Sequence, residues 1–140
     1  MANLAKYRTS NGGFHNDIET HRIVYDFSVD AGATGVLNIF MADQDVLLLD
    51  FMAVVKTTCT SGGSAVLDVG VTGDDDKLVD GIAVASLAAG AVFQSPLVEA
   101  TPNTKQLPVK IASGEKILQT IVTAALTAGK IEYIFRIMKY

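Results

Sequence analysis

The chain has 140 residues, of which 49% are hydrophobic and 19% are charged, so a globally disordered protein is excluded. This length fits one domain that buries enough apolar surface to fold without cross-links, and the single cysteine, Cys59, rules out an internal disulfide or a thiolate metal site. The net charge of −4 argues against a dedicated nucleic-acid-binding protein, which normally carries a basic surface.

Residues 1–20 differ from the rest of the chain, because they are polar, lack a sustained period and contain Asn11-Gly12-Gly13. Two interpretations remain open: a flexible terminus, or an arm that becomes ordered only against a neighbouring molecule. The sequence therefore predicts an N-terminal arm over residues 1–20 and a β-domain over residues 21–140. The arm would be anchored by four apolar side chains, Leu4, Tyr7, Phe14 and Ile18.

Three strands are predicted in the first part of the domain. His21–Val29 alternates between apolar and polar residues, and Val36–Met41 forms a second apolar run before the break at Asp43–Asp45. Val46–Thr60 predicts a long strand whose first half is apolar on both faces, which indicates a central strand or a subunit contact. Leu47, Leu49 and Phe51 are accordingly candidate interface residues.

The middle of the chain is less regular. The turn Ser61–Ser64 and the alternating run Ala65–Val71 predict a hairpin with the long strand. An acidic loop over Gly73–Asp76 follows, and Leu78–Ala91 fits either a short helix or an irregular connection. Val92–Val98 predicts a short edge strand, because its Pro96 cannot donate a backbone hydrogen bond.

Three further strands are predicted near the C-terminus, over Gln106–Ala112, Lys116–Leu126 and Ile131 onward. Turns at Ser113–Glu115 and Thr127–Lys130 would join them into a meander of two hairpins. Valine, isoleucine and threonine make up 37 of the 140 residues, which favours an all-β protein. With seven or eight short strands, the predicted fold is an antiparallel β-sandwich, jelly-roll-like, with an extended N-terminal arm.

The charges are unevenly distributed along the chain. Residues 23–104 contain eleven acidic and two basic residues, whereas residues 105–140 contain six basic and two acidic residues. Either neighbouring strands bring the opposite signs together within one molecule, or an acidic face of one subunit meets a basic face of the next.

Few residues point to chemistry. His15 and His21 have no nearby nucleophile and orienting carboxylate, so surface or interface positions are expected, and Cys59 has no reactive motif around it. A weak calcium candidate lies in the acidic region, but the acids are consecutive and no glutamate closes the site. We therefore expect no enzymatic activity and no cofactor. The weak metal candidates are Asp74, Asp75, Asp76 and Asp80.

Targeting signals are also missing from the sequence. No apolar run follows Lys6 and Arg8, and Val46–Val55 is too short to cross a membrane and is interrupted by Asp50. We expect a protein made in the cytoplasm of its host, without a membrane partner.

One stretch resembles a known class of proteins. Val46–Gly81 combines a long apolar strand, a threonine-rich end, a Gly-Ser turn and the run LDVGVTGDDDKLVDG, and an Ala/Gly-rich connection and the C-terminal strands up to Tyr133–Tyr140 follow. This arrangement is similar to that of small virion proteins of tailed bacteriophages, especially the trimeric β-sandwich decoration, or cement, proteins. The resemblance covers roughly residues 22–140.

The resemblance implies a non-enzymatic structural role. A cement protein on the capsid exterior clamps neighbouring shell subunits, so the implied partners are the major capsid protein and further copies of the same chain in a homotrimer. Similar stretches occur in head-fibre bases and other small phage proteins. A head-fibre base, a tail component or a lectin-like receptor-binding module is therefore the alternative.

Overall fold

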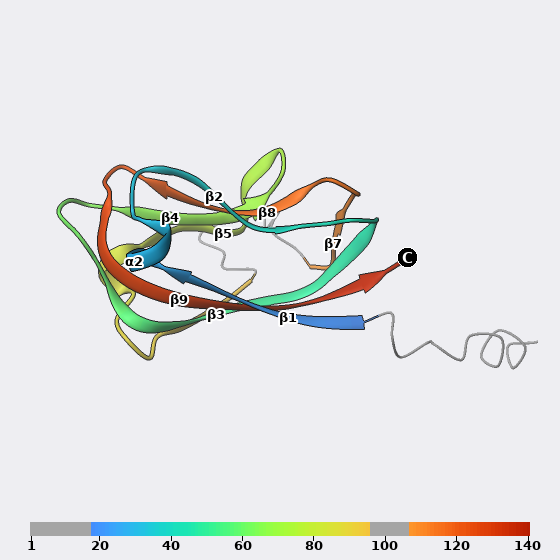
Figure 1. Cartoon of the computed structure of the whole chain (residues 1–140), viewed down its shortest axis with the longest axis horizontal. Coiled ribbons are helices and arrows are strands. Elements are labelled where there is room, and N and C mark those ends of the chain that lie inside the picture. The colour runs from blue at the N-terminus through green and yellow to red at the C-terminus, as the bar shows by residue number, and fades with distance from the viewer. Residues whose placement is uncertain (1–17, 96–106) are drawn as a thin grey trace, which may run out of the picture.

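The structure is a computed structural model that describes residues 18–95 and 107–140. Two layers of β-strands face each other, with β2, β8, β4 and β5 in the upper layer of Figure 1 and β1, β9 and β3 in the lower one. The elements of the described residues are β1 (Ile18–Asp26), α2 (Phe27–Asp30), β2 (Gly35–Met41), β3 (Val46–Ser61), β4 (Val66–Val71), β5 (Asp74–Ala83), the 3-10 turn η2 (Val84–Ser86), β6 (Val92–Gln94), β7 (Val109–Ile111), β8 (Lys116–Val122) and β9 (Leu126–Lys139).

The two sheets are antiparallel. One has the order β1-β9-β3-β6, with β7 also paired to β3, and the other has the order β2-β8-β4-β5. The predicted antiparallel β-sandwich is therefore confirmed. The first strand pairs with the last along its whole length, from Ile18 opposite Met138 to Asp26 opposite Lys130.

The core lies between the sheets and follows the predicted alternation. Along β9, every second side chain is almost fully buried, as is every second side chain of β8. The buried side chains of these two strands are Ile117, Gln119, Ile121, Ile131, Tyr133, Phe135 and Ile137.

Strand β3 is confirmed as a long central strand, but its alternation is interrupted. Its register against β9 shifts between Leu48 and Asp50. Because the shift changes the phase, Leu48 and Phe51 both point into the core, although they are three residues apart. The strand looks apolar on both faces in the sequence because its outward residues Leu47, Met52 and Val54 are apolar as well.

The predicted turn at Thr127–Lys130 is wrong, because these residues belong to β9. β3 and β9 curl together around one end of the sandwich, at the left of Figure 1, with further register shifts between Val55 and Ser61. Gly129, at φ +143°, allows this close approach: a Cβ there would lie 2.6 Å from the Sγ of Cys59. The glycine serves a bent strand rather than a turn.

The first predicted strand ends earlier than expected, because Phe27–Asp30 form a helical turn; Phe27 still packs against the core from there. The side chain of Asp26 accepts hydrogen bonds from the backbone N–H (3.0 Å) and the hydroxyl (2.7 Å) of Ser28. This N-cap starts the one-turn helix α2 and leaves Val29 79% exposed. At its other end, β1 begins at Ile18, so Ile18–Thr20 belong to the sheet rather than to the arm.

The predicted hairpins are wrong. β3 and β4 lie in different sheets, so the turn Ser61–Ser64 crosses between layers. β7, β8 and β9 likewise alternate between the sheets, with β7 and β9 both paired to β3. Each of these strands pairs with strands distant in sequence, and the C-terminal meander does not form.

The acidic loop is also shorter than predicted. The turn contains Thr72 and Gly73, and Asp74–Asp76 already belong to β5, which continues to Ala83. The ambiguous segment Leu78–Ala91 therefore begins as a strand and then forms η2. The edge strand β6 is confirmed at Val92–Gln94, and β7 is shorter than predicted; Pro96 and Gln106 lie outside the described residues.

Opposite charges meet across neighbouring strands of one molecule, as the first of the two charge interpretations predicted. Basic side chains of the C-terminal strand β9 form ion pairs with acids of β1 and β3, and Glu132 of β9 pairs with Arg22 of β1. These pairs are Lys130–Asp26 (3.1 Å), Arg136–Asp50 (2.6 Å), Lys139–Glu19 (2.9 Å) and Arg22–Glu132 (2.5 Å).

The contact between Gly129 and Cys59 predicts a sharp difference between two glycines. Gly129→Ala is expected to lower the free energy of unfolding by about 1–3 kcal/mol, because the new methyl group overpacks the bend. Gly62→Ala is the matched control, since nothing lies within 4 Å of a Cβ at that position. Urea unfolding of both variants measures the difference, and equal stabilities would contradict the tight approach of β3 and β9.

Candidate functional site

His21 contributes to packing rather than to a catalytic group. Its ring stacks on Phe135 at a centroid distance of 5.4 Å and an interplanar angle of 12°, and it lies 5.1 Å from Phe40 of the other sheet. Its Nε2 contacts the carboxylate of Glu19 at 3.1 Å. The expected surface histidine is thus half-buried between the layers, and it contacts Glu19, Phe40 and Phe135. His15 lies outside the described residues.

Cys59 is buried, at 3% exposure, in the curled part of β3. Burial raises the pKa of its thiol, which lowers the thiolate fraction at neutral pH. Its Sγ packs against Gly129 and is 3.8 Å from the carbonyl oxygen of Thr57. The arrangement is that of a packed thiol, as the sequence indicated.

The outer face of β4 and β5 carries the acidic residues. Asp68 of β4 accepts a hydrogen bond from the backbone N–H of Gly81 at 2.6 Å. Its pKa is raised, first by burial and further by the negative charges of Asp75, Asp80 and Asp76, although the Gly81 hydrogen bond acts in the opposite direction. Within the described ranges, no three His, Cys, Asp or Glu side chains are grouped so that they could hold a metal ion.

The candidate interface residues are distributed over three environments. Leu4, Tyr7 and Phe14 lie outside the described residues. Ile18 is 45% exposed on β1, and Leu47 and Leu49 are half-buried on β3. Phe51 points into the core and is 1% exposed, so it is not available to a partner.

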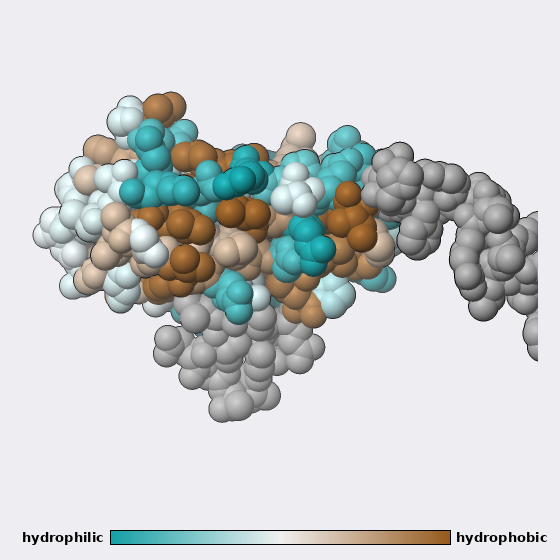
Figure 2. All heavy atoms as spheres, turned by 90° about the horizontal axis from the view of Figure 1, so that it is seen from below, coloured by the Kyte–Doolittle hydropathy of each residue, from teal (hydrophilic) through white to brown (hydrophobic). Residues whose placement is uncertain are grey.

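Ile18 and Leu47 belong to a larger apolar surface, here called the outer face, on the side of the five-stranded sheet that points away from the core. The strand register places its residues in rows across β1, β9, β3 and β6. Figure 2 shows this side of the molecule, with apolar side chains gathered between polar ones. The apolar members are Ile18, Val24, Leu47, Met52, Val54, Val92, Ile134 and Met138.

The charged members of the outer face are paired within it. Arg136 contacts Asp50 through Nε (2.8 Å) and a terminal guanidinium nitrogen (2.6 Å), and Arg22 contacts Glu132. The guanidinium of Arg22 lowers the pKa of Glu132, and Asp50 raises the pKa of Arg136. At one end of the same face Lys130 pairs with Asp26 at 3.1 Å, and Lys56 adds a positive charge near Glu132, so the face is apolar and carries little net charge.

A hollow of about 310 Å³ lies on the outer face. Met52 and Ile134 supply apolar walls, and the Arg136–Asp50 pair and Gln94 supply polar ones. The buried hydroxyl of Ser95, which also lines the hollow, has no hydrogen-bond partner within the described part of the chain. No local sequence pattern predicts this hollow, although the apolar Ile134 and Met138 on the second face of the last strand are its visible signal.

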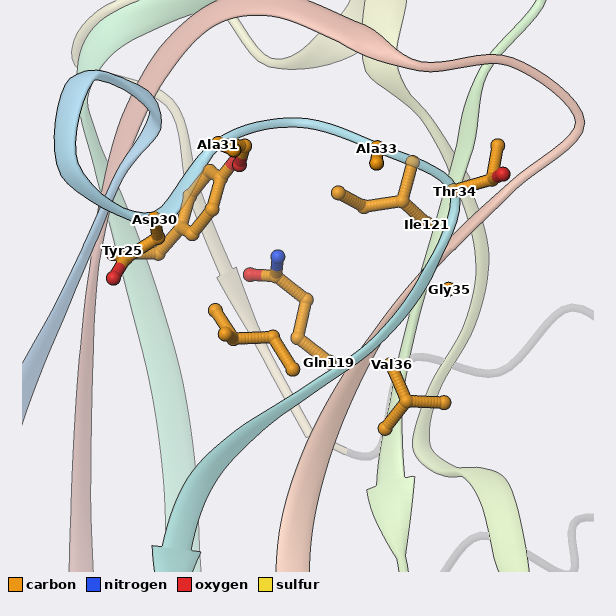
Figure 3. A pocket seen from close by; sticks show the side chains of 10 residues that line it. Tyr25, Asp30, Ala31, Ala33, Thr34, Gly35, Val36, Gln119 and Ile121 are labelled. Carbon is orange, nitrogen blue, oxygen red and sulfur yellow. The ribbon is translucent and has the colours of Figure 1, made fainter.

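A second hollow, of about 180 Å³, opens beside α2 and reaches into the core. Figure 3 shows the amide of Gln119 pointing into it, with Tyr25 on one side and Ile121 on the other. Gln119 is fully buried, and its Oε1 accepts a hydrogen bond from the hydroxyl of Tyr133 at 2.5 Å. Its Nε2 has no partner among the described residues, so the pocket offers both N–H donors of this amide and suits ordered water.

The tyrosines around this pocket are kept neutral. Tyr25 donates a hydrogen bond to the carbonyl oxygen of Ala31 at 2.7 Å, and burial raises its pKa to about 12. Burial also raises the pKa of Tyr133 well above its ordinary value. Neutral phenols bound to a carbonyl and an amide stabilise the interior and supply no general base.

In the described part of the chain, no helix is long and apolar enough to span a membrane. No family model and no curated protein matches the sequence.

Two solved structures share the fold. One is a chain in the capsid of Ralstonia phage GP4, with a TM-score of 0.57 and 15% identity over 89% of this chain and 85% of that chain. The other is a chain in the acidic stable capsid structure of Helicobacter pylori bacteriophage KHP30, with a TM-score of 0.53 and 12% identity over 86% of each chain. The likeness extends over most of both neighbours, and at these identities it defines the β-sandwich architecture.

The hydrogen bond between Gln119 and Tyr133 predicts non-additive mutations. Gln119→Leu leaves the Tyr133 hydroxyl unpaired, and Tyr133→Phe leaves the Gln119 oxygen unpaired, so each is expected to cost about 1–3 kcal/mol. The double variant removes both partners and is expected to cost clearly less than the sum. Urea unfolding of the four proteins measures the coupling, and simple additivity would show that the two groups act independently.

The raised pKa of Asp68 gives a stability effect with a defined sign. A carboxyl whose pKa is higher in the folded than in the unfolded state destabilises the fold when ionised, and this penalty disappears at low pH. Asp68→Asn is therefore expected to raise the melting temperature at pH 7 and to change it little near pH 3. A lower melting temperature of the variant at pH 7 would mean that the carboxylate's bond to Gly81 outweighs its burial.

Proposed function

We propose that this chain is a non-enzymatic structural protein of a phage virion, a cement protein that clamps neighbouring shell subunits as a homotrimer on the capsid exterior. Its partners are the major capsid protein and further copies of itself. The observation that carries the proposal is the fold shared with chains of two phage capsids over more than four-fifths of each chain.

The nearly equal coverage of both chains supports an accessory role. Because each neighbouring chain is matched almost from end to end, each is about as long as this one and consists mainly of the same sandwich. The two matched chains are therefore small proteins of about the length of this one, and neither match is to one domain of a much larger shell subunit.

The chemistry of the described residues is consistent with this role. The histidine, the cysteine and the two buried tyrosines contribute to packing, and the outer face offers an apolar, charge-balanced surface for contacts with other molecules. Clamping needs contact area and rigidity, and many repeated weak contacts on a particle add up to tight binding.

Mass spectrometry of purified virions tests the proposal directly. We expect the chain in a copy number close to that of the major capsid protein, and a trimer in size-exclusion chromatography with light scattering. Tens of copies would favour the head-fibre base, tail or lectin-like alternative. Absence from the particles, or a concentration-independent monomer, would contradict the cement role.

A further inference from the structure

We infer that the outer face of the five-stranded sheet receives the N-terminal segment, residues 1–17, of a second copy of this chain, with Tyr7 in the hollow beside Met52. The inference rests on the proposed function in one respect, since it requires that copies of the chain assemble. Beyond assembly itself, it specifies that the outer face is the covered surface and that residues 1–17 of a second copy cover it.

The chemistry of the outer face favours a contact. Ile18, Val24 and Val92 are 45%, 47% and 59% exposed, and more half-buried apolar side chains lie between them. Because its arginines are already paired with carboxylates, the face does not need an oppositely charged partner. Removal of its apolar atoms from water is therefore the main contribution to the free energy of such a contact. The face of β4 and β5 carries clustered aspartates instead, and contact between two such faces is disfavoured.

The hollow on the outer face fits one large side chain. Its volume of about 310 Å³ is at the lower end of the range for binding pockets. A tyrosine suits it, because the ring would pack on Met52 and Ile134 while the hydroxyl would reach the polar wall formed by Gln94 and the Arg136–Asp50 pair. Tyr7 is the only tyrosine in residues 1–17.

The position of the segment supports the same occupant. It joins the described structure at Ile18, which is itself a member of the outer face, opposite Met138 of β9. Eleven residues separate Tyr7 from Ile18 and span at most about 36–40 Å when extended. This exceeds the roughly 30 Å length of the nine-residue strand β1, so the segment is long enough to leave its own sheet and cross a neighbour's.

Disulfide trapping between copies tests the inference. Full-length Tyr7→Cys and Met52→Cys variants are mixed in equal amounts and oxidised mildly at a concentration where light scattering shows the oligomer. We expect a covalent dimer in the mixture and not in either variant alone. Wild-type protein is the control, because its own Cys59 is buried and does not cross-link.

Each other outcome would overturn the inference. A dimer of Met52→Cys alone would mean that the outer face packs on itself. An intramolecular disulfide in the Tyr7→Cys/Met52→Cys chain, without dimer in the mixture, would mean that the segment covers its own sheet. The absence of any cross-link would mean that the outer face is covered by the shell protein or by residues 96–106 instead. A chain that is abundant in virions yet gives one of these results would keep the proposed function and lose the inference.

A charge on the outer face gives a second readout. Val24→Lys places an ammonium group on the surface to be covered, at a position 47% exposed, so the fold is retained. We expect at least a tenfold weaker self-association in sedimentation equilibrium. Val29→Lys is the matched control, because Val29 is 79% exposed on α2 and lies outside the outer face. An equal effect of both lysines, or no effect of Val24→Lys, would contradict the contact.

Discussion

The structure depends on β9, which pairs with β1 along one edge and with β3 along the other. This strand joins the two ends of the chain, because β1 has no other partner in the described sheet. Its four inward side chains are almost fully buried, and each contributes on the order of 1.5–3 kcal/mol by burial. The aromatic cluster of Phe51, Tyr133 and Phe135 links β9 to its neighbour β3 in the middle of the core.

The outward side chains of the same strand produce the proposed contact surface. Arg136 and Glu132 pair with residues of β3 and β1, and Ile134 and Met138 lie beside them. Exposed ion pairs contribute at most about 1 kcal/mol each to stability. Their more important effect here is to neutralise the face, so that apolar contact can determine its partner. One strand thus combines the core on one side with the interface on the other.

Reactive side chains are used for packing throughout the described residues. His21 fills the space between Phe40 and Phe135, Cys59 packs under Gly129, and the Tyr133 hydroxyl is bound by Gln119. Cys59 and Tyr133 are almost fully buried, which opposes the solvent exposure and the proton transfer that a catalytic role would require, whereas His21 is half-buried. This distribution fits a protein whose proposed role is mechanical.

The sequence by itself determined the strands and their inward residues, because alternation with a period of two is a local property: Ile131 to Ile137 alternate in the chain and are buried in the fold. It also indicated a packed Cys59. The tertiary structure alone decided which strands pair. Ser61–Ser64 has the composition of a hairpin turn, yet both edges of β3 are occupied by β9, β6 and β7, so the chain crosses to the other sheet. Strand pairing, the register shift near Leu49 and the resulting outer face depend on contacts between distant residues, which no local pattern encodes.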